Sequence, residues 1–281
     1  MSWAIWCQGG NDALRYLVNM SAHNPHWQTF ASRWNRLGSP LRPCAEDVQN
    51  FRIALGDAPG HCLLLGVTPE LAHLSAHLTA LDNSADMIGA LWHGEEAAVL
   101  GDWLAMPFEN ASFDNVIGDG CPVLLSWPLQ YEQLFAQVGR VLKPGGKFLL
   151  RTFVGAETAE SAEKVCQDAR DGKMKSFHAF KWRLSMALAA ASPAYTFRIA
   201  DTVAAFDRLL PDRQQLAAAS GWRMEDIETI DFYRGSTACY SYPPLSQVRK
   251  TIPLEFKECE PFYGTYELAE RCPILVLELR A

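Results

Sequence analysis

The sequence predicts an α/β protein built on a doubly wound, mostly parallel sheet, and two observations carry this prediction. Between residues 61 and 154, short apolar runs alternate with segments of helical period, which is the pattern of βαβ units. The run Cys62–Leu65 is also apolar at every position, as in a parallel strand buried on both faces. Consecutive βαβ units cross over with one hand, so they build one continuous sheet.

Residues 1–56 are expected to form a helical N-terminal segment ahead of the sheet. Within residues 11–56, three aromatic side chains spaced by three and four positions share one helix face: Trp27, Phe30 and Trp34. This face either packs on the core or forms a lid over a binding cleft. A break rich in Gly, Ser and Pro at residues 38–43 ends the first helix, and a second helix is predicted over residues 46–55.

The alternating part of the chain predicts five strands, at residues 62–66, 78–81, 97–100, 113–117 and 147–154. Helices are predicted from residue 68 onwards, over 84–92 and over 129–142. Thr68 can cap the first of these helices, Pro69 suits its first position, and Glu70 favours its positive end. The turn Pro144-Gly145-Gly146 stops the last helix.

After residue 154 the alternation is interrupted. Residues 155–212 are predicted to form a mostly helical cap insertion, after which a helix at 212–220 and a strand at 222–232 restore the alternation. Residues 233–272, rich in Tyr and Pro, form a second insertion, and Ile274–Leu279 is the final strand. Residues 57–281 are therefore expected to form one domain with insertions at 155–212 and 233–272.

Composition narrows the classes of function. The chain has 281 residues, of which 49% are hydrophobic, enough for a sizeable core without disulfides or metals. A formal net charge of −7 gives no bulk attraction for phosphate backbones, so nucleic acid is not expected as a partner. There is no apolar run of membrane-spanning length and no signal peptide at Met1–Asn11, so a cytoplasmic protein without a membrane partner is expected.

Several catalytic and metal motifs are absent from the sequence. The segment Gly66–Leu71 reads GVTPEL rather than G-x-G-x-x-G, which argues against a nicotinamide dehydrogenase. The sequence also lacks a P-loop, H-E-x-x-H and G-x-S-x-G. The eight cysteines form no C-x-x-C pair, and His73 and His77, four apart, have no evident third ligand, so no metal is expected.

Three residues stand in succession at the carboxyl ends of predicted strands, where open parallel sheets bind ligands: Gly66, Asp82 and Asp102. Gly66 allows a ligand to approach the backbone. Asp82 can accept hydrogen bonds from both hydroxyls of a ribose, and Asp102 can accept one from an exocyclic amino group such as that of adenine. Trp103 can cover the ring face, and the helix start at Thr68 offers free N–H groups to a carboxylate.

In these places the sequence resembles the class I S-adenosylmethionine-dependent methyltransferases, of the methyltransferase type 11 kind. The resemblance rests on four ordered stretches: LLG at 64–66, LDNSADM at 81–87, GDWLAMPFENASFD at 101–114 and RVLKPGGK at 140–147. It covers residues 60–154 strongly and 212–281 by pattern. It implies a seven-stranded Rossmann-like sheet, with residues 274–279 as an antiparallel strand at the sheet edge.

The resemblance also implies S-adenosylmethionine as cofactor and a role for each site residue. Gly66 and its neighbours Leu65, Val67 and Thr68 would face the methionine part of the cofactor. Asp82 would hold the ribose hydroxyls, and Asn83 and Met87 would flank the adenine or ribose. Asp102 would meet the adenine amino group with Trp103 beside it, and Asp119 would lie near the sulfonium and the methionine amino group.

The first loop departs from the family pattern. The family usually has an acid two residues before the first glycine and two further glycines after it, whereas this chain has Leu64 and then Val67-Thr68-Pro69-Glu70. Two interpretations follow. Either a variant loop still binds the cofactor, or the domain is a degenerate pseudoenzyme that serves as a binding or interaction module.

The expected function is methyl transfer from S-adenosylmethionine to a small-molecule acceptor. Residues 155–212, together with 11–56, are expected to form the cap that shapes the acceptor pocket, because loops and caps carry specificity on a rigid scaffold. Candidate bases in these covering segments are His26, His178 and Tyr195, and none is singled out as catalytic. The identity of the acceptor and the oligomeric state stay open.

Overall fold

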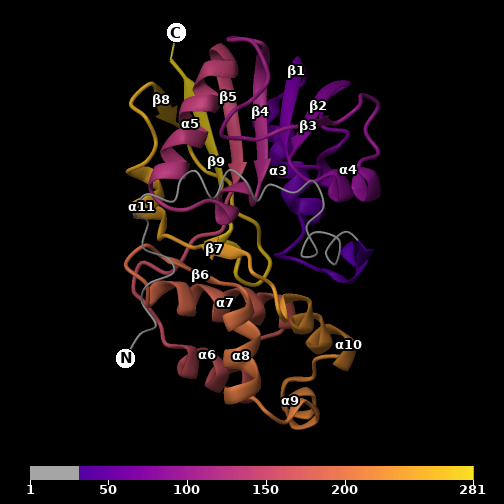
Figure 1. Ribbon diagram of the computed structural model, residues 1–281, viewed down its shortest axis with the longest axis vertical. Helices are drawn as coiled ribbons and strands as arrows, with labels where there is room; N and C mark the ends of the chain where they lie inside the picture. Colours follow the sequence, from indigo (N-terminus) through magenta and orange to yellow (C-terminus); the bar gives the residue numbers. More distant parts are fainter. Residues whose placement is uncertain (1–31, 281) are drawn as a thin grey trace.

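The parallel sheet predicted from the sequence is present and has seven strands. The computed structural model describes residues 32–280, and Figure 1 shows the sheet above a helical layer. The strands follow the order β3-β2-β1-β4-β5-β9-β8, which confirms the doubly wound, mostly parallel Rossmann-like fold. Their bounds are β1 (His61–Leu65), β2 (His77–Asp82), β3 (Val99–Leu100), β4 (Phe113–Asp119), β5 (Leu142–Arg151), β8 (Phe256–Glu258) and β9 (Ile274–Leu279).

The antiparallel strand lies inside the sheet and not at its edge. Strands β1 to β5 pair in parallel, whereas β9 runs antiparallel between β5 and β8. The prediction of an edge position for residues 274–279 is therefore wrong. The burial pattern supplies the reason, since Ile274, Leu275, Val276 and Leu277 are all nearly inaccessible to solvent, as expected for a strand covered on both faces.

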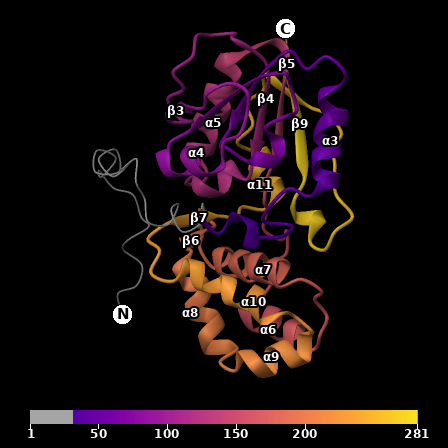
Figure 2. The same cartoon turned by 90° about the vertical axis from the view of Figure 1, so that its right-hand side faces the viewer.

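Helices cover both faces of the sheet. Along β1, Leu63 and Leu65 pack with α5 (Leu129–Val141), whereas Cys62 and Leu64 pack with α3 (Ala45–Leu55). Figure 2 shows these two helices on opposite sides of the strands. The short helix α4 (Ala85–Leu91) begins at Ser84, whose hydroxyl accepts a hydrogen bond from the Met87 N–H, as a helix N-cap does.

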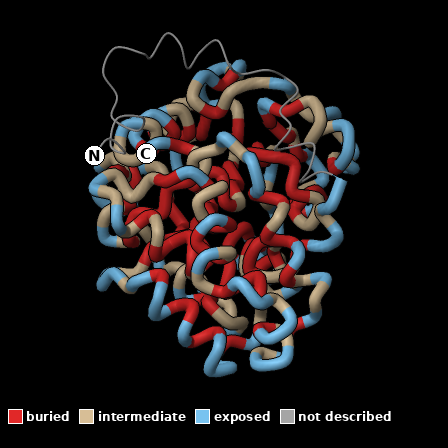
Figure 3. The backbone as a smooth tube through the Cα atoms, turned by 60° about the horizontal axis from the view of Figure 1, so that its bottom comes forward, coloured by how far each residue is buried: buried red, intermediate tan, exposed pale blue. Residues whose placement is uncertain are grey.

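A helical layer lies beyond the carboxyl ends of the parallel strands (Figure 1). We call residues 155–242 the cap. Its elements are α6 (Ala162–Arg170), α7 (Phe177–Ala190), β6 (Thr196–Arg198), α8 (Ala200–Leu209), α9 (Arg213–Ser220), α10 (Met224–Ile227), the 3₁₀ helix η4 (Glu228–Tyr233) and β7 (Cys239–Ser241). Strands β6 and β7 pair as a small antiparallel sheet. With the cap turned forward, Figure 3 shows buried segments in the interior and exposed segments around the rim.

Short elements complete the chain. Three 3₁₀ helices, η1 (Trp34–Arg36), η2 (Pro69–Leu71) and η3 (Cys121–Leu124), lie in connections near the carboxyl ends of the strands. Helix α11 (Leu245–Arg249) and the 3₁₀ helix η5 (Ala269–Arg271) lie between the cap and the last strand in the chain. The predicted helix at 46–55 is confirmed as α3. Trp27 and Phe30 lie outside the described residues.

The strand predicted at 222–232 is wrong, because this segment forms α10 and η4 in the cap. The buried residues Ile227, Ile230 and Tyr233 recur every third position, which is the period of a 3₁₀ helix and not of a strand. Strand β8 instead completes the sheet on the far side of β9.

The helix predicted from Thr68 is also wrong, since only the single 3₁₀ turn η2 forms there. The Thr68 side chain makes no capping hydrogen bond. Most of the expected first helix lies outside the described residues; Ser32 is helical, and η1 follows it before α3 begins.

Candidate functional site

A cavity opens at the carboxyl edge of the sheet, between the strand ends and the cap. Every predicted cofactor residue except Asp102 lies in its wall: Leu65, Gly66, Val67, Thr68, Asp82, Asn83, Met87, Trp103 and Asp119. The wall continues on the other side with residues of η1 and the following segment, of η3, of the segment after β5, and of the cap: Trp34, Leu37, Leu41, Cys121, Val123, Leu124, Phe153, Trp182, Tyr233 and Tyr240. The cavity thus has a strand-end half and a cap half.

Gly66 opens the strand-end half. Its φ of +101° lies in the region that favours glycine, and its N–H donates to the Leu81 carbonyl at 2.8 Å. A Cβ at this position would point between two side chains, 3.9 Å from Asp82 Oδ2 and 4.0 Å from Trp103 Cζ2. The absence of a side chain at Gly66 therefore leaves space between a carboxylate and an indole ring.

Asp82 presents a buried carboxylate to this space. Only 8% of the residue is exposed, and Oδ1 accepts a hydrogen bond of 2.8 Å from the Ser84 N–H. Burial raises the pKa of Asp82 to about 6, against the opposing effect of backbone hydrogen bonds from Ser84 and Asn83. Each carboxylate oxygen can accept two hydrogen bonds, so the group retains capacity for a ligand hydroxyl.

Trp103 is fixed beside Asp82 by its indole N–H, which donates to the Leu81 carbonyl at 2.7 Å. Asp102 is placed differently from the other predicted cofactor residues. It does not line the cavity, and its Oδ1 accepts a hydrogen bond of 2.9 Å from the Leu104 N–H within its own turn. The Asp102 side chain thus shapes the loop that carries Trp103.

Thr68 connects the first loop to the end of β4. Its hydroxyl donates to Asp119 Oδ2 over 3.5 Å, a long hydrogen bond. Because η2 is a single turn and Pro69 has no N–H, the run of free helical N–H groups expected here for a ligand carboxylate does not form. The loop side chain therefore contacts the carboxylate at the neighbouring strand end instead of capping a helix.

Asp119 belongs to a buried network of charges behind the cavity. Arg151, with no exposed surface, donates from Nη1 to Asp119 Oδ1 at 2.7 Å, and its Nε lies 3.5 Å from Asp47 Oδ1. Asp47 also accepts from the Tyr266 hydroxyl at 2.8 Å. Burial raises the pKa of Asp119, and the contact with Arg151 opposes that rise. Two carboxylates share one guanidinium here, so the wall at Asp119 is negative in character.

The cap half is apolar and rich in rings. Phe153 and Trp182 lie with their ring centroids 4.3 Å apart, and Tyr233 and Tyr240 lie 6.5 Å apart. Trp34, with Leu37 and Leu41, adds the N-terminal side of the wall. Within residues 32–280, no Lys, Arg or His side chain lines the cavity.

The segment that carries Trp34 is tied across the edge of the sheet. Arg42 Nε donates to Glu70 Oε1 at 2.7 Å, and its guanidinium lies 5.4 Å from the centroid of the Trp34 ring. Arg151 also donates to the Pro40 carbonyl. These contacts hold the segment against the loop after β1 and against the end of β5.

None of the candidate bases that the structure describes lies in the cavity wall. His178 packs against Gly38 and lies 3.9 Å from Asp226, and burial lowers its pKa to about 4, so it is neutral at pH 7. Tyr195 packs edge-on against Trp127, with the ring centroids 5.3 Å apart. His26 lies outside the described residues. Sequence reasoning had not selected Phe153, Tyr233 or Tyr240, although the Tyr-rich stretch after residue 232 was a signal.

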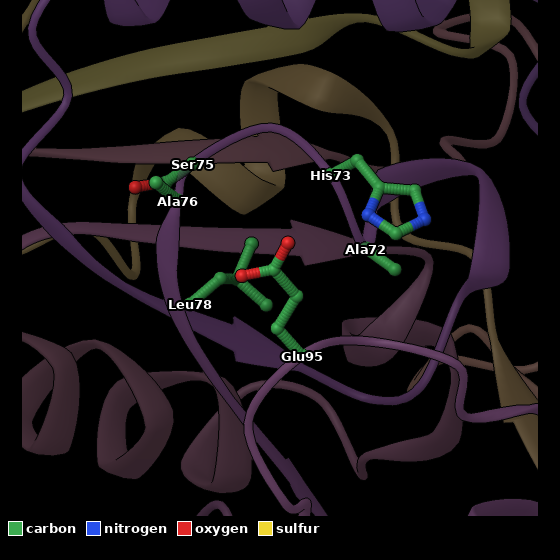
Figure 4. Close-up of a pocket in the computed structure, with 6 residues that line it drawn as sticks. All are labelled: Ala72, His73, Ser75, Ala76, Leu78 and Glu95. Carbon is green, nitrogen blue, oxygen red and sulfur yellow. The ribbon is translucent and has the colours of Figure 1, made fainter.

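A second, shallow hollow lies apart from the strand ends, lined by the segment around His73 to Leu78 and by Glu95 (Figure 4). It shares no residue with the cavity just described. In the described part of the chain, no group of three or more His, Cys, Asp or Glu side chains is arranged to hold a metal ion. Nor does any helix of residues 32–280 combine the length and apolarity needed to cross a membrane.

Comparison with known proteins finds a family model that matches the segment containing strands β1 to β5. Residues 62–150 match the family model of the methyltransferase domain. An alignment of 114 positions, which covers 37% of this chain, shows 35% identity to the biotin biosynthesis bifunctional protein BioHC of Teredinibacter turnerae. The match spans 19% of that curated relative, so most of its length has no counterpart here.

Two solved structures are similar to this chain. A structure from Rhodobacter sphaeroides, provisionally described as a Zn-dependent alcohol dehydrogenase, matches with a TM-score of 0.52 and 14% identity over 90% of this chain and 98% of its own. The S-adenosylmethionine-dependent methyltransferase of Mesorhizobium loti matches with a TM-score of 0.47 and 17% identity over 85% of this chain and 100% of its own. At such identities the first likeness shows the fold alone.

Proposed function

We propose that this chain, whose residues 62–150 form a methyltransferase domain of class I type, transfers a methyl group from S-adenosylmethionine to a small-molecule acceptor. One observation carries the proposal. Gly66 leaves a space bounded by the Asp82 carboxylate and the Trp103 ring, at the carboxyl edge of the sheet and next to Asp119.

The residues of the strand-end half fit this cofactor. Asp82 has a buried carboxylate that can accept from vicinal ribose hydroxyls, and charge-assisted hydrogen bonds of this kind are among the stronger ones. Trp103 and Met87 supply apolar surface for the adenine. Asp119, backed by Asp47, gives negative character opposite a cationic sulfonium and ammonium. We assign the cofactor contacts to these residues together with Leu65, Val67, Thr68 and Asn83.

The protein's contribution to the reaction is binding and orientation. When bound, S-adenosylmethionine supplies a methyl group that is already electrophilic. We place the acceptor beside Asp119 and against the wall formed by the cap and the Trp34 segment, where its binding would displace water from the reacting groups. Neither His178 nor Tyr195, the two candidate bases among the described residues, lines the cavity, so no catalytic residue is assigned.

Direct titration tests this proposal against its alternatives. Calorimetry with the full-length chain is expected to show saturable binding of S-adenosylmethionine and of S-adenosylhomocysteine, and no binding of NAD, because the first loop lacks the dinucleotide fingerprint. Saturable NAD binding without a response to either sulfur ligand would overturn the proposal. Binding of none of the three would favour the pseudoenzyme, since the first loop lacks the acid and the two further glycines of the family pattern.

A further inference from the structure

The cap half of the cavity has a composition that selects its ligand. Its wall consists of rings and aliphatic side chains, with Phe153 from the segment after β5, Trp182 from α7, Tyr233 from η4 and Tyr240 from β7. Aromatic walls of this kind favour flat apolar ligands, since ring pairs gain offset or edge-to-face contacts beyond the burial of area.

Charged ligands have no partner in this half. Among residues 32–280, the only charged side chains in the cavity wall are Asp82 and Asp119, both on the strand-end half. Asp119 is paired with Arg151, whose side chain is fully buried behind it. An anion placed among the rings would be desolvated without a counter-charge, which costs several kcal/mol. A cation would be desolvated in the same way, with only the ring faces, worth about 0.5–2 kcal/mol, as compensation.

Two wall residues carry an unused hydrogen-bond donor. The indole N–H groups of Trp34 and Trp182 are buried, and neither donates to another group of the described chain. Trp182 is only 6% exposed. Buried donors are normally paired, so an orphaned indole N–H in a cavity wall indicates a ligand that supplies an acceptor.

We propose, resting on the function proposed above, that the methyl acceptor is an uncharged, planar aromatic molecule that carries a hydrogen-bond-accepting oxygen. Its ring lies among Phe153, Trp182, Tyr233 and Tyr240, and its oxygen accepts from the indole N–H of Trp182. An orphaned N–H needs an acceptor, which an ammonium group does not have, and a carboxylate is disfavoured because no cationic side chain among residues 32–280 lines this half.

A matched series of probes tests the class of ligand. Acetophenone, benzoate, benzylammonium and cyclohexyl methyl ketone are titrated by ligand-observed NMR into the full-length chain saturated with S-adenosylhomocysteine. Acetophenone is expected to bind at least about tenfold more tightly than either charged probe, and more tightly than the aliphatic ketone. Equal or tighter binding of a charged probe, or no binding of acetophenone, would overturn the inference.

Trp182→Phe tests the donor, because it keeps a ring and removes the N–H. Acetophenone is expected to bind about three- to tenfold more weakly to this variant, the value of one neutral hydrogen bond. Affinity for S-adenosylhomocysteine is expected to stay within about twofold. Trp127→Phe is the control, because Trp127 also has a buried indole N–H without a partner in the described chain but does not line the cavity.

The outcomes separate this inference from the proposed function. If S-adenosylhomocysteine does not bind the wild-type chain, the proposed function fails, and the probe series without it still measures the preference of the cap half. If the sulfur ligand binds but Trp182→Phe takes acetophenone as tightly as Trp127→Phe does, the assigned donor is wrong. The wild-type series decides the ligand class even if Trp182→Phe does not fold.

Discussion

The two halves of the cavity are built by different means. In the strand-end half, Gly66, Asp82 and Trp103 are fixed by hydrogen bonds to the backbone of nearby residues, such as Leu81 and Ser84. In the cap half, the rings are brought together by packing between segments far apart in the sequence. The first half offers polar groups of fixed direction, whereas the second offers an apolar surface with few polar atoms.

The same contrast holds for the two fully buried cations of the described chain. Arg151, at the end of β5, lies between the carboxylates of Asp119 and Asp47. Lys181, in α7, donates to the hydroxyl of Thr229 at 3.0 Å and lies among the rings of Phe177, Phe232 and Tyr233. The sheet thus keeps a compensated charge beside the cavity, while the cap contains a lysine whose charge no carboxylate contacts.

The largest expected effect comes from breaking the compensated network. Arg151→Met leaves Asp119 and Asp47 buried without their counter-charge, and loss of one partner from a buried ion pair typically costs about 3–5 kcal/mol. We expect the free energy of unfolding, measured in urea at pH 7, to fall by this amount. Binding of S-adenosylmethionine should weaken as well, because Asp119 loses the group that orients it.

Arg249→Met is the control for that substitution. Arg249 pairs with Glu258 at 2.7 Å, but its side chain is 45% exposed, and exposed pairs are worth about 1 kcal/mol or less. A loss for Arg151→Met no larger than the loss for Arg249→Met would show that the buried network does not hold the strand ends together.

The next largest effect is expected at Asp82. Asp82→Asn keeps the size of the side chain but removes the charge and one acceptor oxygen, and hydrogen bonds to a charged group are worth about 1.5–3 kcal/mol. Calorimetry should show S-adenosylmethionine binding weakened by about ten- to a hundredfold. Thermal unfolding should change little, because the residue ends a strand and does not fill the core.

Asp86→Asn is the matched comparison, one helical turn further along and outside the cavity wall. Its affinity for the cofactor should resemble that of the wild type. If Asp86→Asn weakens binding and Asp82→Asn does not, the ligand lies on the other side of the start of α4 from where we place it.

The strand-end half could be predicted from the sequence because its information is local. A mostly apolar run such as Leu78–Leu81 predicts a buried strand, and the residue that follows the run must lie at the carboxyl end of that strand. Gly66 and Asp82 were selected in this way, whereas Asp119 was selected from the family resemblance, and all three line the cavity. Asp102 does not line the cavity, and its side chain bonds within its own turn, a local contact that strand periodicity does not encode.

The cap half could not be predicted because its contacts are non-local. Tyr233 and Tyr240 reach the cavity through the packing of η4 and β7 against other cap elements, and no pattern in the sequence links them to Trp182. The incorrect strand at 222–232 has the same origin. Apolar residues in that segment suit either a short strand or a turn of helix, and burial against α7 and α8 decides between them.

A change of pH should affect the strand-end half in a defined direction. The pKa of Asp82 is raised to about 6 from 3.8, so the folded protein holds a proton between these values that the unfolded chain has lost. Acidification therefore weakens ligand binding, because it neutralises the carboxylate. Protonation of Asp82 does not lower the free energy of unfolding, because the folded protein binds this proton more tightly than the unfolded chain does. From pH 7.5 to pH 5.0, affinity for S-adenosylmethionine should fall by about tenfold, because about a tenth of the Asp82 side chains stay ionised.

Asp82→Asn distinguishes this titration from other effects of acid. The variant has no carboxylate to protonate, so its weaker affinity should be nearly the same at both pH values. Calorimetry at the two pH values makes the comparison. An equal fall in wild type and variant would assign the pH dependence to a different group.

The smallest effect, and the only gain, is expected in the cap. Burial lowers the pKa of Lys181 to about 7 from 10.5, with Asp226 acting against the shift. Between these values the unfolded chain binds a proton that the folded protein does not, so the stability contributed by this group rises as pH increases through this range and is lowest below pH 7.

Lys181→Met removes the cost of burying the ammonium group and fills a similar volume, at the loss of the hydrogen bonds to Thr229. We expect the free energy of unfolding in urea to rise by about 1 kcal/mol at pH 7, and by less at pH 9. Lys173→Met is the control, since Lys173 is exposed and paired with Asp171, and its effect should be small and equal at both pH values. A loss of stability for Lys181→Met at both pH values would show that the lysine is needed among its rings, and that the two buried cations stabilise the fold alike.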